Sequence, residues 1–167
     1  IKNLTSNRAS NLTKWVDPKL NILIPMAGEG SRFKDAGFFF PKPIIEVLNK
    51  PMIQWVIESL NIEANYIFLI QKKHQEKFNI KSMLKILQPN CKIVEINKLT
   101  EGAACTTLLA KKYINNNDSL IIANSDQYIK WNSSQSIYNF ITKKIDGGIL
   151  TFNSVHPKWS YARCDKD

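Results

Sequence analysis

Short apolar stretches alternate with longer amphipathic stretches along most of the chain. The apolar stretches predict strands over Asn21–Ile24, Tyr66–Ile70, Cys91–Ile96, Ser119–Ala123 and Gly148–Phe152. The stretches between them predict helices over Pro51–Leu60, Gln75–Leu87 (one broken helix or two), Glu101–Lys112 and Ser133–Lys144. This alternation predicts an α/β fold, a Rossmann-like three-layer α/β/α sandwich with a mostly parallel sheet. Residues 1–19 lack periodicity, so we expect a tail or linker there and a domain over residues 20–167.

The first predicted strand runs into a loop whose composition suits phosphate binding. Gly28 and Gly30 are one residue apart, Ser31 and Arg32 follow them, and Lys42 lies between two prolines. Glycines let the backbone approach a phosphate with its N–H groups aimed at the oxygens. Arginine adds a planar fork of donors, and lysine adds a point charge. The segment therefore predicts a site for a polyphosphate.

Two common phosphate loops are excluded by the spacing. The chain has no G-x-x-x-x-G-K-[ST] string, which a Walker A loop requires. The dinucleotide fingerprint G-x-G-x-x-G needs a third glycine, and that position holds Phe33. The acidic residue that would bind a ribose is also missing, since the second predicted strand ends at Ile70-Gln71-Lys72. The loop is therefore of another type.

The strings Ala27-Gly28-Glu29-Gly30-Ser31-Arg32-Phe33 and Pro41-Lys42-Pro43 resemble the signature of the sugar nucleotidyltransferases. This family includes the NDP-sugar pyrophosphorylases and the glucose-1-phosphate thymidylyltransferases, and the resemblance extends from about Leu20 to the end of the chain. It implies an enzyme that moves NMP from an NTP to a sugar 1-phosphate, giving an NDP-sugar and pyrophosphate. It implies Arg32 and Lys42 as catalytic residues. It also implies nucleotide-binding roles for Ala27, Gly28, Glu29, Gly30 and Ser31.

An aspartate follows the fourth predicted strand directly. Leu120-Ile121-Ile122-Ala123 runs into Asn124-Ser125-Asp126. Mg²⁺ binds one or two carboxylates, keeps several waters and takes further ligands from substrate phosphates. In the resembled family an aspartate at the end of this strand is a metal ligand, and Asp126 matches it, with Ser125 beside the nucleotide. The alternative is an ordinary Asx turn.

The loop after the third predicted strand resembles the element that recognises the base in this family. Asn97 and Gly102 have the required spacing, so both are expected to contact the nucleotide. Glutamine is common at the position of Asn97 in the thymidylyltransferases, so the base stays open. The alternative is a plain helix N-terminus with Thr100 as the N-cap.

The segment near the C-terminus resembles the sugar pocket of the family. Trp159 and Tyr161 are the expected substrate-binding residues, with Tyr161-Ala162 standing where the family commonly has Tyr-Gly. That departure leaves the sugar open. The alternative is aromatic packing with no ligand.

Composition narrows the classes of binding partner and the cellular compartment that we expect. The net charge of +9 invites a nucleic-acid reading, but lysines are scattered and greatly outnumber arginines, and no aromatic and basic RNA-binding motif is present. The N-terminal stretch is polar and no apolar run is long enough for a membrane span, so we expect no membrane association. Cys91, Cys105 and Cys164 are odd in number and lack metal-ligand spacing, which indicates reduced thiols in a cytoplasmic protein.

The expected ligands are an NTP, a sugar 1-phosphate and Mg²⁺, and a homo-oligomer stays open. In the resembled family the sheet continues beyond the position of Asp167. Residues 20–167 are therefore expected to be the N-terminal, nucleotide-binding part of a nucleotidyltransferase domain whose C-terminal portion is missing. Two alternatives stay open: a cytidylyltransferase for phosphocholine or a polyol phosphate, and a non-catalytic nucleotide-binding domain of a larger protein.

Overall fold

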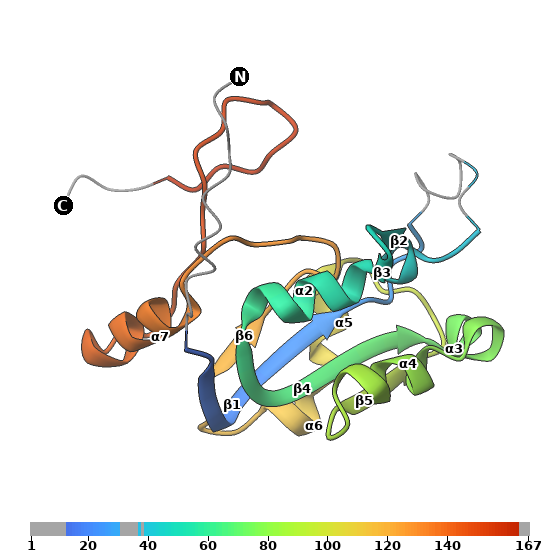
Figure 1. The fold of residues 1–167 in the computed structure, drawn as a ribbon, viewed down its shortest axis with the longest axis horizontal. Helices are drawn as coiled ribbons and strands as arrows, with labels where there is room; N and C mark the ends of the chain where they lie inside the picture. Colours follow the sequence, from blue (N-terminus) through green and yellow to red (C-terminus); the bar gives the residue numbers. More distant parts are fainter. Residues whose placement is uncertain (1–12, 31–36, 38, 164–167) are drawn as a thin grey trace. The chain divides into compact units, whose positions relative to one another are not determined.

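The first of two compact units contains a four-stranded parallel sheet (Figure 1). The computed structural model describes residues 13–30, 37 and 39–163, and the units are Ile1–Ser134 and Gln135–Asp167. The strands are β1 (Trp15–Pro25), β4 (Ile62–Gln71), β5 (Lys92–Ile96) and β6 (Leu120–Ile122), in the order β5-β4-β1-β6. Each of the three neighbouring pairs is parallel.

The strand order places a switch point at the centre of the sheet. The chain moves outward from β1 through β4 to β5, and then returns to the other side of β1 to form β6. Leu23 of β1 pairs with Ile67 of β4 on one side and with Ile122 of β6 on the other. In open α/β sheets, ligands bind beyond the carboxyl ends of the strands at such a point. The ends of β1 and β6 therefore mark the place to look for a site.

Helices cover both faces of this sheet, which confirms the predicted α/β/α arrangement. Right-handed crossovers put the helices of the outward path on one face and those of the return path on the other. In Figure 1, α2 passes in front of the sheet and α6 lies behind it. The helices of the first unit are α2 (Met52–Leu60), α3 (Lys72–Phe78), α4 (Ile80–Leu87), α5 (Ala103–Leu108) and α6 (Lys111–Ile114).

The core fills the space between the sheet and these helices. β1 and β4 each carry a continuous buried run, as expected for parallel strands covered on both faces. Leu23, Ile67 and Leu69 pack with Ala110 and with α6 on one face. Each such side chain contributes roughly 1.5–3 kcal/mol when fully buried. This packing fixes the strand ends that carry the loops.

Two predicted helices are broken in the structure. The stretch predicted as Gln75–Leu87 forms α3 and α4, because Asn79 between them adopts the left-handed conformation with φ 50°. The stretch predicted as one helix over Glu101–Lys112 forms α5 and α6. The hydroxyls of Thr106 and Thr107 donate to backbone carbonyls one turn earlier, which competes with regular helix geometry at this break.

The expected tail over residues 1–19 is wrong in its second part, because β1 begins at Trp15. The backbone N–H of Trp15 donates to the carbonyl of Asn61 (3.3 Å). Lys14 also pairs with Glu63 (3.0 Å). The register shifts between Val16 and Asn21. Because this stretch is irregular, hydrophobic periodicity did not reveal that the strand begins at Trp15.

The predicted strand Gly148–Phe152 is also wrong, since these residues have no regular structure. They belong to the second unit, which also contains most of α7 (Ser133–Thr142). A strand is stable only when a neighbouring strand takes its N–H and C=O groups. Ile149 and Phe152 are mostly exposed instead. Apolar composition alone was therefore not sufficient to identify a strand here.

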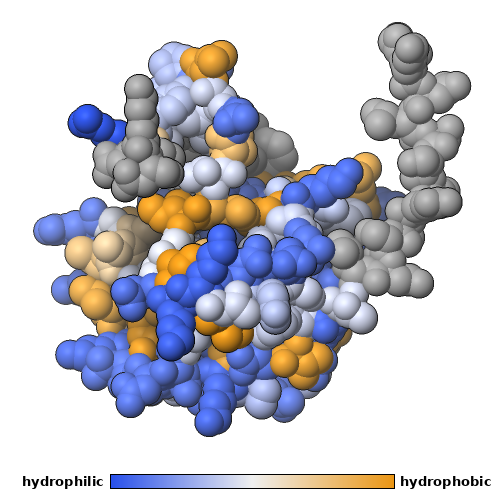
Figure 2. All heavy atoms as spheres, turned by 90° about the vertical axis from the view of Figure 1, so that its left-hand side faces the viewer, coloured by the Kyte–Doolittle hydropathy of each residue, from blue (hydrophilic) through white to orange (hydrophobic). Residues whose placement is uncertain are grey.

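The surface of the described residues is mixed. Figure 2 shows hydrophobic residues exposed in separate patches among hydrophilic ones on one face. Exposed apolar residues are normal on folded domains, so these patches assign no interface. None of the helices within the described ranges is both long and apolar enough to cross a bilayer.

Candidate functional site

The glycine loop leaves β1 at the carboxyl edge of the sheet. Its entry is held by β4: the N–H of Met26 donates to the carbonyl of Leu69 (2.9 Å), and the buried amide of Gln71 donates to the carbonyl of Ala27. Ala27 is buried, whereas the next two residues are exposed. The loop therefore starts from a rigid point and presents its backbone outward.

The two glycines of the loop serve different purposes. Gly30 has φ +62°, a conformation in which other residues are strained, and an added Cβ would lie 3.7 Å from the Cβ of Lys42. Gly28 is not among the glycines with positive φ, and an added Cβ there would meet nothing within 4 Å. The described residues thus give no internal reason for glycine at position 28. Its open backbone is available to a ligand.

Lys42 and Asp126 meet at the switch point. Lys42 begins the short 3-10 helix η1 (Lys42–Ile44), and Asp126 lies in the turn after β6. The Lys42 Nζ forms an ion pair with the Asp126 Oδ2, and both side chains are partly buried. The backbone before this turn is tied to the first strand, because the N–H of Ala123 donates to the carbonyl of Leu23 (3.0 Å). The two residues expected at one site are therefore brought together.

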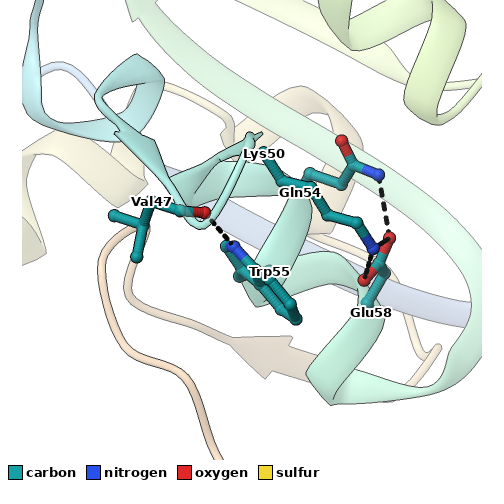
Figure 3. Close-up of polar contacts among 5 residues, drawn as sticks. All are labelled: Val47, Lys50, Gln54, Trp55 and Glu58. Atoms are coloured by element: carbon teal, nitrogen blue, oxygen red, sulfur yellow. Dashed lines mark hydrogen bonds and ion pairs between the residues drawn. The ribbon is translucent and has the colours of Figure 1, made fainter.

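A small hairpin and α2 fix the chain after Lys42. The hairpin pairs β2 (Glu46–Val47) with β3 (Lys50–Pro51). Figure 3 shows the Trp55 indole of α2 donating to the carbonyl of Val47 (2.7 Å). The hairpin follows η1 directly, so this contact restrains the path of the backbone that carries Lys42.

A charged cluster reinforces the same contact. Lys50 donates to both oxygens of Glu58 (2.9 and 2.8 Å), and its ammonium lies 4.7 Å from the centre of the Trp55 ring (Figure 3). Gln54 also donates to Glu58. Burial acts to raise the pKa of Glu58, but the bonds from Lys50 and Gln54 together hold that pKa below its usual value. The carboxylate is therefore kept ionised and able to anchor the hairpin.

Asp126 belongs to no cluster of potential metal-ligating side chains in the described part of the chain. Across residues 13–30, 37 and 39–163, no three His, Cys, Asp or Glu side chains cluster closely enough to hold a metal ion. Ser125 and Asp126 both lie in the turn that the Asx-turn reading anticipated. A single carboxylate still fits Mg²⁺ when the remaining ligands are waters and substrate phosphates. A single carboxylate therefore suits a cation that binds together with a nucleotide.

A pocket of about 260 Å³ opens beside the loop, and the sequence did not predict it. Lys73 of α3 pairs with Glu29 at 2.5 Å. Lys77 lies 4.2 Å from the centre of the Phe39 ring. The only advance indication was the run of lysines at the start of α3. The pocket is lined by Glu29, Gly30, Phe39, Phe40, Pro41, Lys42, Lys73, His74, Lys77 and Phe78.

His74 in this pocket has a perturbed acid–base equilibrium. Burial is the largest cause that lowers the pKa of His74 below its usual 6.5, and the charge of Lys73 lowers it further. Glu29 acts in the opposite direction. The imidazole therefore reports on the charges around the glycine loop.

The predicted base-recognition loop lies at the same edge of the sheet, after β5. Asn97 and Gly102 are both exposed there. Thr100 is not the N-cap of α5: that position belongs to Gly102, and the Thr100 hydroxyl donates to the carbonyl of Gly102 (3.1 Å). The threonine therefore shapes the loop rather than starting the helix.

The remaining predicted site residues are not among the described residues of the first unit. Ser31 and Arg32 are outside the described residues. Trp159 and Tyr161 belong to the second unit, where Trp159 packs edge-on against Phe152 and the Tyr161 hydroxyl donates to the carbonyl of His156 (2.9 Å). Their expected role with a sugar stays a prediction.

Comparison with known proteins gives a consistent picture. A family model described as nucleotidyl transferase matches residues 22–161. The bifunctional protein GlmU of Methanocaldococcus jannaschii is 31% identical over 107 residues, which is 64% of this chain and 25% of that protein. A mannose-1-phosphate guanyltransferase of Aspergillus oryzae is 29% identical over 155 residues, covering 85% of this chain and 40% of that protein.

The fold also matches solved structures. A putative glucose-1-phosphate thymidylyltransferase from Bacillus anthracis superimposes with a TM-score of 0.59 at 17% identity, covering 75% of this chain and 51% of that chain. The chain thus spans about half of this structure and less than half of the two curated relatives.

Proposed function

The chain belongs to the nucleotidyl transferase family, and on this basis we propose that it moves NMP from an NTP to a sugar 1-phosphate, giving an NDP-sugar and pyrophosphate. One observation supports the proposal most directly. The Lys42–Asp126 ion pair lies at the carboxyl edge of the sheet, and Gly30 of the loop after β1 lies against Lys42 there. A cationic side chain, an acidic side chain and a free glycine backbone at one switch point suit a magnesium–triphosphate complex.

The proposed reaction needs positioning more than covalent chemistry. An oxygen of the sugar 1-phosphate attacks the α-phosphorus of the NTP, a new P–O bond forms, and the bond to pyrophosphate breaks. The nucleophile arrives already anionic, so no enzyme side chain has to be deprotonated or acylated. Catalysis then depends on aligning two anions and stabilising the charge that develops between them.

Each element of the loop has a role in this scheme. The backbone N–H groups from Gly28 to Ser31 bind the triphosphate, with Ala27 and Glu29 completing the loop. Arg32 stabilises charge on the leaving pyrophosphate. Lys42 stabilises the α-phosphate and the incoming phosphate. Gly28 supports this assignment because an added Cβ there would meet none of the described residues within 4 Å.

Asp126 is the residue proposed to hold a divalent cation, and Mg²⁺ is the ion that fits a carboxylate combined with phosphate oxygens. Such an ion, when bound, screens the phosphate charges and polarises the α-phosphate. In the ligand-free protein Lys42 neutralises Asp126. Nucleotide binding is proposed to separate the pair, so that each side chain meets an opposite charge on the ligand.

Further residues are proposed to contact the nucleotide and the sugar. Asn97, Gly102 and Ser125 are proposed to contact the nucleotide, and Trp159 and Tyr161 the sugar. The names of these similar proteins suggest hexose 1-phosphates as the acceptor class and guanine or thymine as the base. Cys91 and Cys105 are free thiols, which supports a reducing, cytoplasmic location.

A ligand panel tests the proposal. The full chain is mixed with ATP, CTP, GTP, UTP or dTTP, with and without Mg²⁺, and its thermal midpoint is measured. A bound NTP at about 100 times its dissociation constant should stabilise the protein by roughly 2.7 kcal/mol. Pyrophosphate release is then measured with that NTP and hexose 1-phosphates.

The outcomes separate the competing functions. Preference for CTP with release dependent on phosphocholine or a polyol phosphate would identify a cytidylyltransferase. Binding without turnover would indicate a nucleotide-binding domain. No stabilisation by any NTP would overturn the proposal.

A further inference from the structure

A carboxylate lies within the loop that is proposed to bind phosphate. Glu29 stands between Gly28 and Gly30, and its side chain is 44% exposed. The Lys73 ammonium lies 2.5 Å from its Oε1. Lys73 comes from α3, directly after β4, so the pair joins the loop of one central strand to the helix that follows the other.

An unneutralised carboxylate at this position would oppose a triphosphate. Two like charges 4 Å apart repel by about 1 kcal/mol in water and by about 4 kcal/mol at an effective dielectric constant near 20. The latter value is typical of protein surfaces, so the repulsion is large enough to change binding tenfold or more. A lysine in contact with the carboxylate removes most of this repulsion and turns the Glu29 side chain toward α3.

The pair has little to do with folding. Both side chains are well exposed, at 58% for Lys73 and 44% for Glu29. Exposed ion pairs contribute roughly 0–1 kcal/mol to stability. The opposite effects of Lys73 and Glu29 on the pKa of His74 agree with their position at one pocket. An effect on ligand binding can therefore be measured without unfolding the protein.

We propose that Lys73 is a positioning residue of the nucleotide site: it neutralises Glu29 and draws its carboxylate away from the phosphates, so that the loop accepts a triphosphate. The inference rests on the proposed function of the same loop. Lys73 acts through Glu29 and not by contact with the nucleotide. Removal of the carboxylate should therefore make the lysine dispensable.

A double-mutant cycle in the full chain tests this. The probe is whichever of ATP, CTP, GTP, UTP and dTTP binds the unmodified protein most tightly with Mg²⁺, measured by titration calorimetry. Lys73→Ala should weaken binding about tenfold, which corresponds to one neutralised repulsion of moderate strength. In the Glu29→Gln background, where the carboxylate is gone, the same Lys73→Ala replacement should change affinity less than about threefold.

Lys72→Ala is the matched control. Lys72 is the preceding residue of α3, is also exposed, and pairs with Glu76 of the same helix. It should change affinity less than about twofold, in line with an exposed pair away from a ligand. Thermal midpoints should agree among all variants.

The results distinguish failure of this inference from failure of the function. If the unmodified protein binds no NTP, the proposed function and the inference fall together. If it binds an NTP, but Lys73→Ala behaves like Lys72→Ala, the inference alone is wrong. If Lys73→Ala weakens binding as much in the Glu29→Gln background as in the unmodified protein, the lysine contacts the nucleotide directly and the inference is again wrong.

Discussion

The ammonium of Lys42 and the carboxylate of Asp126 form an ion pair across the switch point of the sheet. The lysine reaches it from a proline-flanked 3-10 helix, and the aspartate from the turn after an edge strand. Both side chains are partly buried, so each limits the motion of the other. Opposite charges held together after β6 are what a phosphate and its cation both require.

Replacement of Asp126 by Asn should abolish the Mg²⁺-dependent part of NTP binding and lower turnover by about 10²–10³-fold, because one preorganised charge is lost. Stability should change by no more than about 1 kcal/mol, since the pair is partly exposed. Titration calorimetry with and without Mg²⁺ measures the first effect. Asp118→Asn, at the other end of β6, is the control and should leave binding unchanged. A turnover loss below threefold for Asp126→Asn would contradict the role.

Replacement of Gly28 by Ala should preserve the fold and weaken NTP binding by about tenfold or more, which is at least ~1.4 kcal/mol. The added methyl group meets no atom of the described residues within 4 Å, so we expect the conflict to be with the ligand. Gly30→Ala should instead destabilise the protein by about 1–2 kcal/mol because of its left-handed backbone. Gly147→Ala is the control, since that glycine is equally open but lies in the second unit. Equal NTP affinity of Gly28→Ala and Gly147→Ala would count against a phosphate site at Gly28.

NTP binding should raise the pKa of His74, because phosphate anions favour the charged imidazolium. In the free protein burial and Lys73 hold this pKa below 6.5. Proton NMR titration of the imidazole resonances measures it, and His156 in the second unit is the internal control. A His74 pKa that is insensitive to NTP would show that the phosphates lie away from this pocket.

The same shift has a consequence for stability. The folded pKa of His74 is lower than its unfolded pKa, so the unfolded chain binds the proton more readily. The contribution of His74 is fully present above about 6.5 and is lost as pH falls through the folded pKa. The thermal midpoint of His74→Gln should therefore fall less steeply on acidification than that of the unmodified protein. Parallel curves for the two proteins would contradict this sign.

Replacement of Trp55 by Phe should lower stability by about 1 kcal/mol, because its hydrogen bond to Val47 is lost. Turnover should fall several-fold as well, since the hairpin restrains the segment that carries Lys42. Trp131→Phe removes a similar indole bond, to the carbonyl of Ser59, and is the matched control. It should lower stability alike but spare turnover. Equal turnover in the two variants would show that the contact between the hairpin and α2 does not influence catalysis.

The alternation of apolar and amphipathic stretches was enough to predict a parallel sheet covered on both faces, and α2 was placed to within a residue. The string from Ala27 to Phe33 was enough to indicate a phosphate loop. Such features are local, because strand periodicity, backbone freedom at glycine and the reach of one side chain depend on near neighbours.

The pairing of Glu29 with Lys73 and that of Val47 with Trp55 were not predicted. Gly148–Phe152 was wrongly taken as a strand, because its apolar residues match strand composition while the neighbour that a strand requires is a matter of tertiary structure. Residue type and spacing thus indicated the chemistry that we propose for the loop. The order of the strands decided which side chains meet it, because partners distant along the chain are selected by packing and sheet topology, which no local pattern encodes.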